Sequence, residues 1–317
     1  MTIPPHWTIR RLAGVIGAEV IGPDIRNPTA ETVAAIRQLL LEHLVIFLPG
    51  QAPSPEEHVA FARHFGQLEG HPNLGGGEGL PPEIFQLAAS EGGIADEWHT
   101  DITFDASPPL MSVLHLVQCP EYGGDTMWSS LYAAYEALSP PLQELCEGLT
   151  ALHDALPHNR PDRMTIHPVV RVHPETGRKA LYVNSHFTRR IVELSAGESD
   201  LLLGYLTRWI ASERFTVRYQ WRPGSIGIWD NRCTAHYVLN DFVGERIIQR
   251  ATVTGDRVEG ASPPRWQPAV GDERLSAANR HDQQLFNYLR AEGRIGAEVR
   301  GYGDLLPTEE RDAQQTP

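Results

Sequence analysis

The chain has 317 residues, of which 41% are hydrophobic and 21% charged, and its formal net charge is −13. This length suffices for one large buried core or two smaller ones. The acidic balance opposes nonspecific binding to nucleic acid and to anionic membranes, so neither is expected as a partner. The three cysteines, Cys119, Cys146 and Cys233, form no Cys-x-x-Cys pair, which argues against a disulfide scaffold or a zinc-thiolate site. Neither a membrane-spanning apolar run nor a signal-peptide pattern is present, so we expect a cytoplasmic protein.

The N-terminal part of the chain predicts short strands and two helices. Residues 8–22 are β-like runs broken by glycines, and apolar positions at helical spacing predict a helix over residues 29–43. The compact apolar run at 44–48 predicts a buried strand. Ser54, followed by proline and two glutamates, has the pattern of a helix N-terminus, and that helix should run to about residue 65.

Residues 70–97 contain a glycine-rich run and little periodicity, and they are expected to form a mobile loop. No Gly-Lys-Ser/Thr follows the glycines, so a phosphate-binding loop is not predicted. Beyond this loop the chain alternates strands and turns. The predicted strands are 110–116, 126–128, 169–173, 180–183, 215–219, 226–229 and 247–254, and the predicted helices are 131–138, 140–149 and 197–211. This pattern indicates a mainly β fold with peripheral helices, a β-sandwich or jelly roll.

The C-terminal part differs in composition from the rest. Residues 259–270 are rich in Pro, Ser and Gly and are expected to be a linker, and a helix is predicted over 279–292. The polar tail from residue 306 is expected to be disordered. We therefore predict a main domain, residues 1–258, and a C-terminal extension, residues 259–317.

The tripeptide His99-Thr100-Asp101 carries the first chemical signal. In an extended segment alternate side chains point the same way, so His99 and Asp101 can reach one point in space. A second histidine would complete the two-His-one-carboxylate face that binds Fe(II) and leaves coordination positions open. In a chain with 14 histidines and 40 acidic residues, a His-x-Asp match also arises by chance. On an exposed strand end, such a tripeptide is more often a solvated pair than a pair of metal ligands.

The second signal is a histidine followed by two arginines. His236 comes after a strand and a turn, and the next strand carries Arg246 and Arg250 on one face by period two. Paired guanidiniums favour carboxylate or sulfonate ligands, because the planar fork matches them. A surface strand that pairs with Asp241 and Glu245 is an alternative interpretation. His236 by itself is more often a turn or core histidine than a metal ligand.

Taken together, these segments resemble the taurine dioxygenase/2,4-D dioxygenase family of Fe(II)- and 2-oxoglutarate-dependent oxygenases. The resemblance covers about residues 8–257 and rests on an ordered set of motifs. These are Trp98-His-Thr-Asp101 with Thr103-Phe104, Gly123-Gly-Asp-Thr126, His167-Pro-Val-Val-Arg171 with His173-Pro and Gly177, Trp229-Asp-Asn-Arg232, His236, Arg246, Arg250 and Gly255-Asp256.

The resemblance implies a double-stranded β-helix, or jelly-roll, core and the use of Fe(II), 2-oxoglutarate and O₂, with release of succinate and CO₂. It also implies residue roles: iron ligands His99, Asp101 and His236; a 2-oxoglutarate contact from the Thr126 hydroxyl; an ion pair of Arg246 with the distal carboxylate of 2-oxoglutarate; and a substrate contact from Arg250. The presence of Asp101 points to hydroxylation, because halogenating relatives leave this position vacant.

The substrate is less well defined by the resemblance. His71 and Phe187 match substrate-contacting positions, although a loop histidine and a core phenylalanine are alternatives. Ala155 and Leu156 fall where a pocket phenylalanine is expected. We expect a small organic anion larger or more apolar than taurine, an alkyl sulfate or sulfonate whose hydroxylated product collapses to an aldehyde and a released anion.

Several alternatives remain at this point. The substrate could instead be a carboxylic acid, such as an aryloxy acid, an amino-acid derivative or a natural-product intermediate. A non-catalytic jelly-roll binding module is a further possibility, as is a zinc hydrolase with a metal-bound water. In the hydrolase the paired arginines and Thr126 have no natural role. We further expect a homo-oligomer, a dimer or a tetramer.

Overall fold

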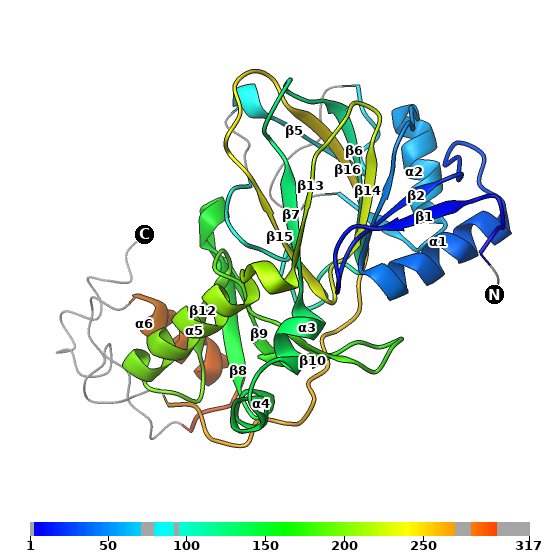
Figure 1. Cartoon of the computed structure of the whole chain (residues 1–317). Helices are drawn as coiled ribbons and strands as arrows, with labels where there is room; N and C mark the ends of the chain where they lie inside the picture. The colour runs from blue at the N-terminus through cyan, green and yellow to red at the C-terminus, as the bar shows by residue number, and fades with distance from the viewer. Residues whose placement is uncertain (1–2, 71–78, 92–94, 270–279, 297–317) are drawn as a thin grey trace.

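The structure is a computed structural model that describes residues 3–70, 79–91, 95–269 and 280–296. Its frame is a large sheet in the order β1-β2-β3-β14-β6-β16-β4, with β5 also paired to β16 (Figure 1). Its pairs are antiparallel except for β2 with β3. The strands are β1 (Thr8–Arg11), β2 (Ala18–Ile21), β3 (Val45–Leu48), β4 (Leu68–Glu69), β5 (Ile84–Ala88), β6 (Met111–Gln118), β14 (Ile226–Asp230) and β16 (Ile247–Val253).

A smaller antiparallel sheet packs against one face of the large sheet. It has the order β13-β7-β15, and its strands are β7 (Thr126–Ser130), β13 (Thr216–Tyr219) and β15 (Thr234–Val238). The apolar side chains between the two sheets form one cluster, in which Trp128 of β7 and Ala235 of β15 meet Phe47 and Trp229 of the large sheet. Two facing antiparallel sheets are the arrangement predicted for a jelly roll.

The other face of the large sheet is covered by the helices α1 (Ala30–His43) and α2 (Pro55–Arg63), drawn in blue in Figure 1. Alternation along β3 shows how the sequence serves both faces: Val45 and Phe47 belong to the inner cluster, whereas Ile46 and Leu48 pack in the cluster beneath the helices. The predicted capping box at Ser54 is confirmed, since Ser54 and Glu57 bond reciprocally.

A third group of elements lies beside the two sheets. It contains a sheet of order β12-β8-β9 and the hairpin β10-β11. The strands are β8 (Thr150–Ala155), β9 (Arg160–Pro168), β10 (Val170–Val172), β11 (Lys179–Leu181) and β12 (Thr188–Ile191). The helices are α3 (Leu131–Glu136), α4 (Pro140–Glu147), α5 (Ala196–Ile210) and α6 (Arg280–Ala291), with short 3₁₀ turns η1 (Ala89–Glu91), η2 (Leu156–His158) and η3 (Glu213–Phe215).

All seven strands predicted between residues 110 and 254 are present, with small shifts at their ends. The structure corrects the expectation of one loop over residues 70–97, because β5 lies within it and pairs with β16. Residues 71–78 and 92–94 of that segment lie outside the described residues. Strands β8, β9, β12 and β15 were not predicted, since polar residues and prolines interrupt their apolar pattern.

The helix predicted over 279–292 is α6, and its side chains Leu285, Phe286 and Leu289 pack against Leu152 of β8 and Val192. Residues of the predicted linker also bond to the body, since the Ala261 amide donates to the Val170 carbonyl. The tail expected to be disordered lies outside the described residues. Within the described ranges, the structure has no helix with the length and apolarity needed to span a membrane.

Candidate functional site

His99 and His236 are brought together by a backbone bridge between distant parts of the chain. The His99 amide donates to the His236 carbonyl at 2.9 Å, and the His236 amide donates back at 2.7 Å. The extended segment expected around His99 is limited to this single bridge, because the chain then turns and Ile102 adopts a positive φ of 52°. The Thr100 hydroxyl donates to the Thr234 carbonyl at 2.8 Å, which ties the turn to β15.

The side chains of His99, Asp101 and His236 converge as the sequence predicted. Their candidate ligand atoms all lie within 4.8 Å of one another, and all three residues are buried. The Nε2 atoms of His99 and His236 each lie 3.8 Å from Asp101 Oδ1. Two imidazoles and one carboxylate around one point form the donor set of a two-His-one-carboxylate iron site.

The protonation states of these groups suit a metal. His99 Nδ1 lies 2.7 Å from the Glu97 carbonyl, which can only accept, so Nε2 keeps its lone pair. Burial lowers the pKa of His99 to about 4 and that of His236 well below its ordinary value. Burial alone would raise the pKa of Asp101, but Arg250 and the two histidines hold it below its usual range. Two neutral imidazoles and an ionised carboxylate are the forms that ligate a divalent cation.

Asp101 has further partners, one on each oxygen. The Ser112 hydroxyl donates to Oδ2 at 2.9 Å, and Arg250 Nη1 donates to Oδ1 at 2.6 Å. The Arg250 guanidinium also lies 5.2 Å from the centre of the Phe85 ring. Arg250 therefore lies between the candidate metal-binding group and the cavity beside it.

Arg246 and Thr126 form a second polar group in the cavity. Arg246 Nε donates to the Gly124 carbonyl at 3.1 Å, and its Nη2 lies 3.4 Å from Thr126 Oγ1. Burial lowers the pKa of Arg246 to about 10, and it remains a cation at neutral pH. None of the carboxylates that the structure describes forms an ion pair with it. A buried cation without a carboxylate partner fits a bound dicarboxylate such as 2-oxoglutarate.

Both polar groups open into one cavity of about 490 Å³ between the two sheets. Arg246, Ile248 and Arg250 all line it, as the period-two alternation predicted. Phe187 also lines it, with its ring 6.4 Å from that of His99. His71 lies outside the described residues. The apolar walls include Phe85, Leu87, Ile102, Leu114, Pro157, Phe187, Val238 and Ile248.

One wall of the cavity was not predicted. Ala155 and Leu156 do not line it, and Ala155 is buried in a cluster with Phe187. Instead η2 and the residue after it present Pro157, His158 and Asn159. Asn159 adopts a left-handed φ of 56°, a conformation that asparagine tolerates. The Pro-x-Asn sequence was therefore the signal from which this turn could have been predicted. Burial lowers the pKa of His158 to about 4, which leaves it neutral.

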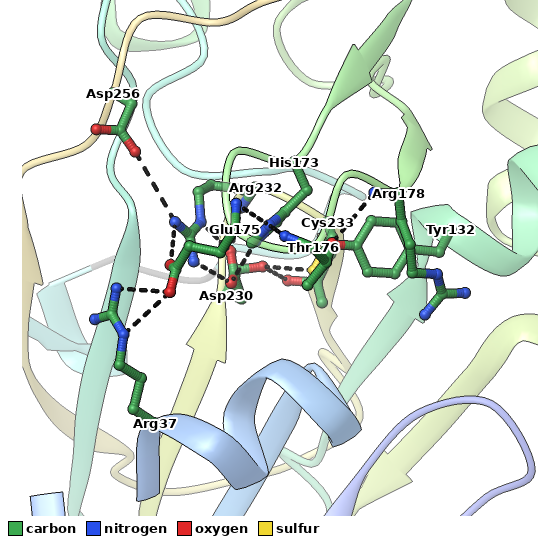
Figure 2. Close-up of polar contacts among 11 residues, drawn as sticks. Arg37, Tyr132, His173, Glu175, Thr176, Arg178, Asp230, Arg232, Cys233 and Asp256 are labelled. Atoms are coloured by element: carbon green, nitrogen blue, oxygen red, sulfur yellow. Dashed lines mark hydrogen bonds and ion pairs between the residues drawn. The ribbon is translucent and has the colours of Figure 1, made fainter. Parts of the chain in front are cut away.

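A second group of potential ligands, His173, Asp230 and Cys233, also has its atoms within 4.8 Å of one another (Figure 2). Its carboxylate is already satisfied, because Arg232 donates to both oxygens of Asp230 and His173 Nε2 lies 3.0 Å from Oδ2. Burial raises the pKa of the Cys233 thiol well above its usual value. A guanidinium in place of a metal makes this group a buried ion-pair cluster rather than a cation site.

Comparison with known proteins agrees with this geometry. Residues 8–252 match the family described as "Taurine catabolism dioxygenase TauD, TfdA family". The chain is 37% identical to an alkylsulfatase from Acinetobacter baylyi, over 89% of this chain and 96% of that protein. It is 36% identical to an alpha-ketoglutarate-dependent sulfate ester dioxygenase from Pseudomonas putida, over 78% and 89%. A crystal structure of a taurine dioxygenase from Burkholderia xenovorans, 38% identical, superposes with a TM-score of 0.74 over 81% and 94%.

The fold and the site thus define a 2-oxoglutarate-dependent oxygenase with a jelly-roll core, which confirms the fold class, the enzyme class and the cofactors Fe(II), 2-oxoglutarate and O₂. The chain belongs to the TauD/TfdA family of dioxygenases. This membership favours the oxygenase over the zinc hydrolase and the non-catalytic binding module.

Proposed function

We propose that the chain hydroxylates a small organic anion with an apolar body, a sulfate ester first and a sulfonate second. The observation that carries the proposal is one cavity in which a two-His-one-carboxylate group, two arginines and apolar walls meet. The sulfate-ester activity in the names of two similar proteins supports the choice of substrate class. The anion would face Arg250, whose planar fork matches sulfate oxygens.

In this proposal His99, Asp101 and His236 hold Fe(II), and Arg246 and Thr126 hold 2-oxoglutarate. When bound, the iron and 2-oxoglutarate supply the oxidising power that places one oxygen atom of O₂ on a substrate carbon, with release of succinate and CO₂. The protein holds the reactants in place and excludes water with the walls around Phe85, Leu114 and Ile248. A carbon that carries both the new hydroxyl and the sulfate oxygen collapses to an aldehyde and free sulfate.

A carboxylic acid, such as an aryloxy acid, is the second candidate substrate. Arg250 would pair with a carboxylate as readily as with a sulfate, so the cavity charge does not separate the two. Their products do separate them, because only the sulfate ester releases inorganic sulfate.

A substrate panel tests the proposal. Purified protein with Fe(II), 2-oxoglutarate and O₂ is offered alkyl sulfates, alkyl sulfonates, aryloxy acids and amino-acid derivatives, and succinate is measured for each. We expect the largest rise in succinate with alkyl sulfates, in equal amounts with aldehyde and sulfate. Succinate formation with aryloxy acids alone would move the assignment to the second candidate, and no succinate with any member would refute the oxygenase proposal for this site.

The two arginines should affect different reactants. Arg246→Gln is expected to raise the KM for 2-oxoglutarate by about 10-fold or more, since a hydrogen bond to a charged group contributes about 1.5–3 kcal/mol. The KM for the sulfate ester should change much less. Arg250→Gln should instead raise the KM for the sulfate ester much more than the KM for 2-oxoglutarate. Steady-state kinetics with each reactant varied in turn measures both effects, and equal effects of the two variants would show that the roles are assigned wrongly.

A further inference from the structure

Four buried side chains form a hydrogen-bonded chain that ends on Asp101. The Trp229 indole donates to Asn231 Oδ1 at 2.9 Å, Asn231 Nδ2 donates to Ser112 Oγ at 3.0 Å, and the Ser112 hydroxyl donates to Asp101 Oδ2 at 2.9 Å. Asn231 and Ser112 are both 0% exposed. Neither residue lines the cavity. Asn231 belongs to the Trp229-Asp-Asn-Arg232 motif, but the sequence assigned no role to it or to Ser112.

The chemistry of the two ends fixes the direction of every bond in this chain. An indole nitrogen can only donate, and an ionised carboxylate can only accept. The amide of Asn231 must therefore turn its oxygen to Trp229 and its nitrogen to Ser112, and the single proton of Ser112 must go to Asp101. If the amide were reversed, its nitrogen would face the Trp229 indole, which is also a donor. Its oxygen would face Ser112 Oγ, whose proton is already given to Asp101.

The sequence neighbours of Asn231, Asp230 and Arg232, both belong to the buried ion-pair cluster of Figure 2. Asp230 Oδ1 accepts from the Arg232 amide at 2.8 Å, and the Arg232 guanidinium spans both oxygens of the same carboxylate. Arg232 Nη1 also lies 2.8 Å from Glu175, and Glu175 in turn pairs with Arg37 of α1. The turn between β14 and β15 is thereby anchored to elements outside both sheets.

The hydrogen-bonded chain holds one oxygen of Asp101, Oδ2. The other oxygen, Oδ1, lies 3.8 Å from both histidine Nε2 atoms and also accepts from Arg250 Nη1 at 2.6 Å. We propose that Asn231 is a positioning residue that acts through Ser112 to present Asp101 Oδ1 to the metal. The inference rests on the proposed function, because it presupposes that Asp101 is a metal ligand.

The test measures metal affinity rather than turnover. Mn(II) binding to the full chain is titrated for the wild type, Asn231→Ala, Ser112→Ala and the double variant, with the melting temperature of each metal-free protein recorded. Ser129→Ala is the matched control, because the Ser129 hydroxyl is also 0% exposed but donates to the Ile210 carbonyl. His99→Ala reports whether the measured Mn(II) occupies the expected site.

We expect each single variant to bind Mn(II) about 10- to 100-fold more weakly, the range typical of residues that hold a metal ligand. The Mn(II) affinity of the double variant should be no lower than that of the single variant with the lower affinity, since both substitutions break the same hydrogen-bonded chain. Ser129→Ala should bind as the wild type does. Wild-type affinity in Ser112→Ala, or the same loss in Ser129→Ala, would overturn the inference, even if Asn231→Ala does not fold. Mn(II) binding that His99→Ala leaves unchanged would refute the metal site itself.

Discussion

Replacing Arg232 with alanine is expected to lower the free energy of unfolding by about 3–5 kcal/mol, because it leaves the Asp230 carboxylate buried without its main partner. Both side chains are almost fully buried, with 3% and 1% exposure. Chemical denaturation at pH 7 measures the difference. Arg160→Ala is the control: its ion pair with Asp162 is exposed to solvent, and its loss should change stability little.

The loss of stability in Arg232→Ala should depend on pH. In the wild type, burial alone would raise the pKa of Asp230, but Arg232 and His173 hold it well below its ordinary value. A lowered folded-state pKa contributes stability above the unfolded-state pKa of about 3.9, and this contribution is lost as the pH falls further. In Arg232→Ala burial prevails and the carboxyl can take up a proton. The gap in stability between wild type and variant should therefore narrow from pH 7 to pH 4, and a constant gap would contradict the ion-pair explanation.

Replacing His236 with alanine is expected to lower Fe(II) affinity and turnover by on the order of 100-fold or more, since loss of a residue that merely supports a metal ligand already costs about 10- to 100-fold. The anaerobic complex of protein, Fe(II) and 2-oxoglutarate should give a weak visible charge-transfer band, and this band should be absent in the variant. His186→Ala is the control, because His186 lines the same cavity without belonging to the candidate metal-binding group. Succinate formation at the wild-type rate by His236→Ala would remove His236 from the site.

The sequence was sufficient for residues whose role follows from spacing. His99, Asp101 and His236 converge as predicted. Arg250 of β16 and Arg246, the residue just before that strand, share a cavity because alternate residues of an extended segment face the same way. Ser112 and Asn231 could not be predicted in this way. Ser112 owes its place to the register of β6 against β14, where it lies opposite Trp229. That register depends on pairing between segments more than a hundred residues apart, which no local pattern encodes.

The cavity wall around His158 escaped prediction for a related reason. Its position depends on η2, a turn between two strands, β8 and β9, that local patterns did not identify. Strand β15 shows the same limit, since the five residues Thr234–Val238 are too short and too mixed to predict a strand alone. They form one because β7 offers a partner edge next to the His99 bridge.

The packing of α6 connects this helix to one wall of the cavity. Leu285, Phe286 and Leu289 of this helix rest on Leu152, a residue of the strand that leads into the turn at Pro157 and His158. The candidate iron ligands lie on β15 and on the segment that bridges to it, and the paired arginines lie on and just before β16. The wall at Pro157 and His158 is instead supported from the side of α6. We therefore expect substitutions in α6 to change which molecules fit the cavity, while His99, Asp101 and His236 keep their positions.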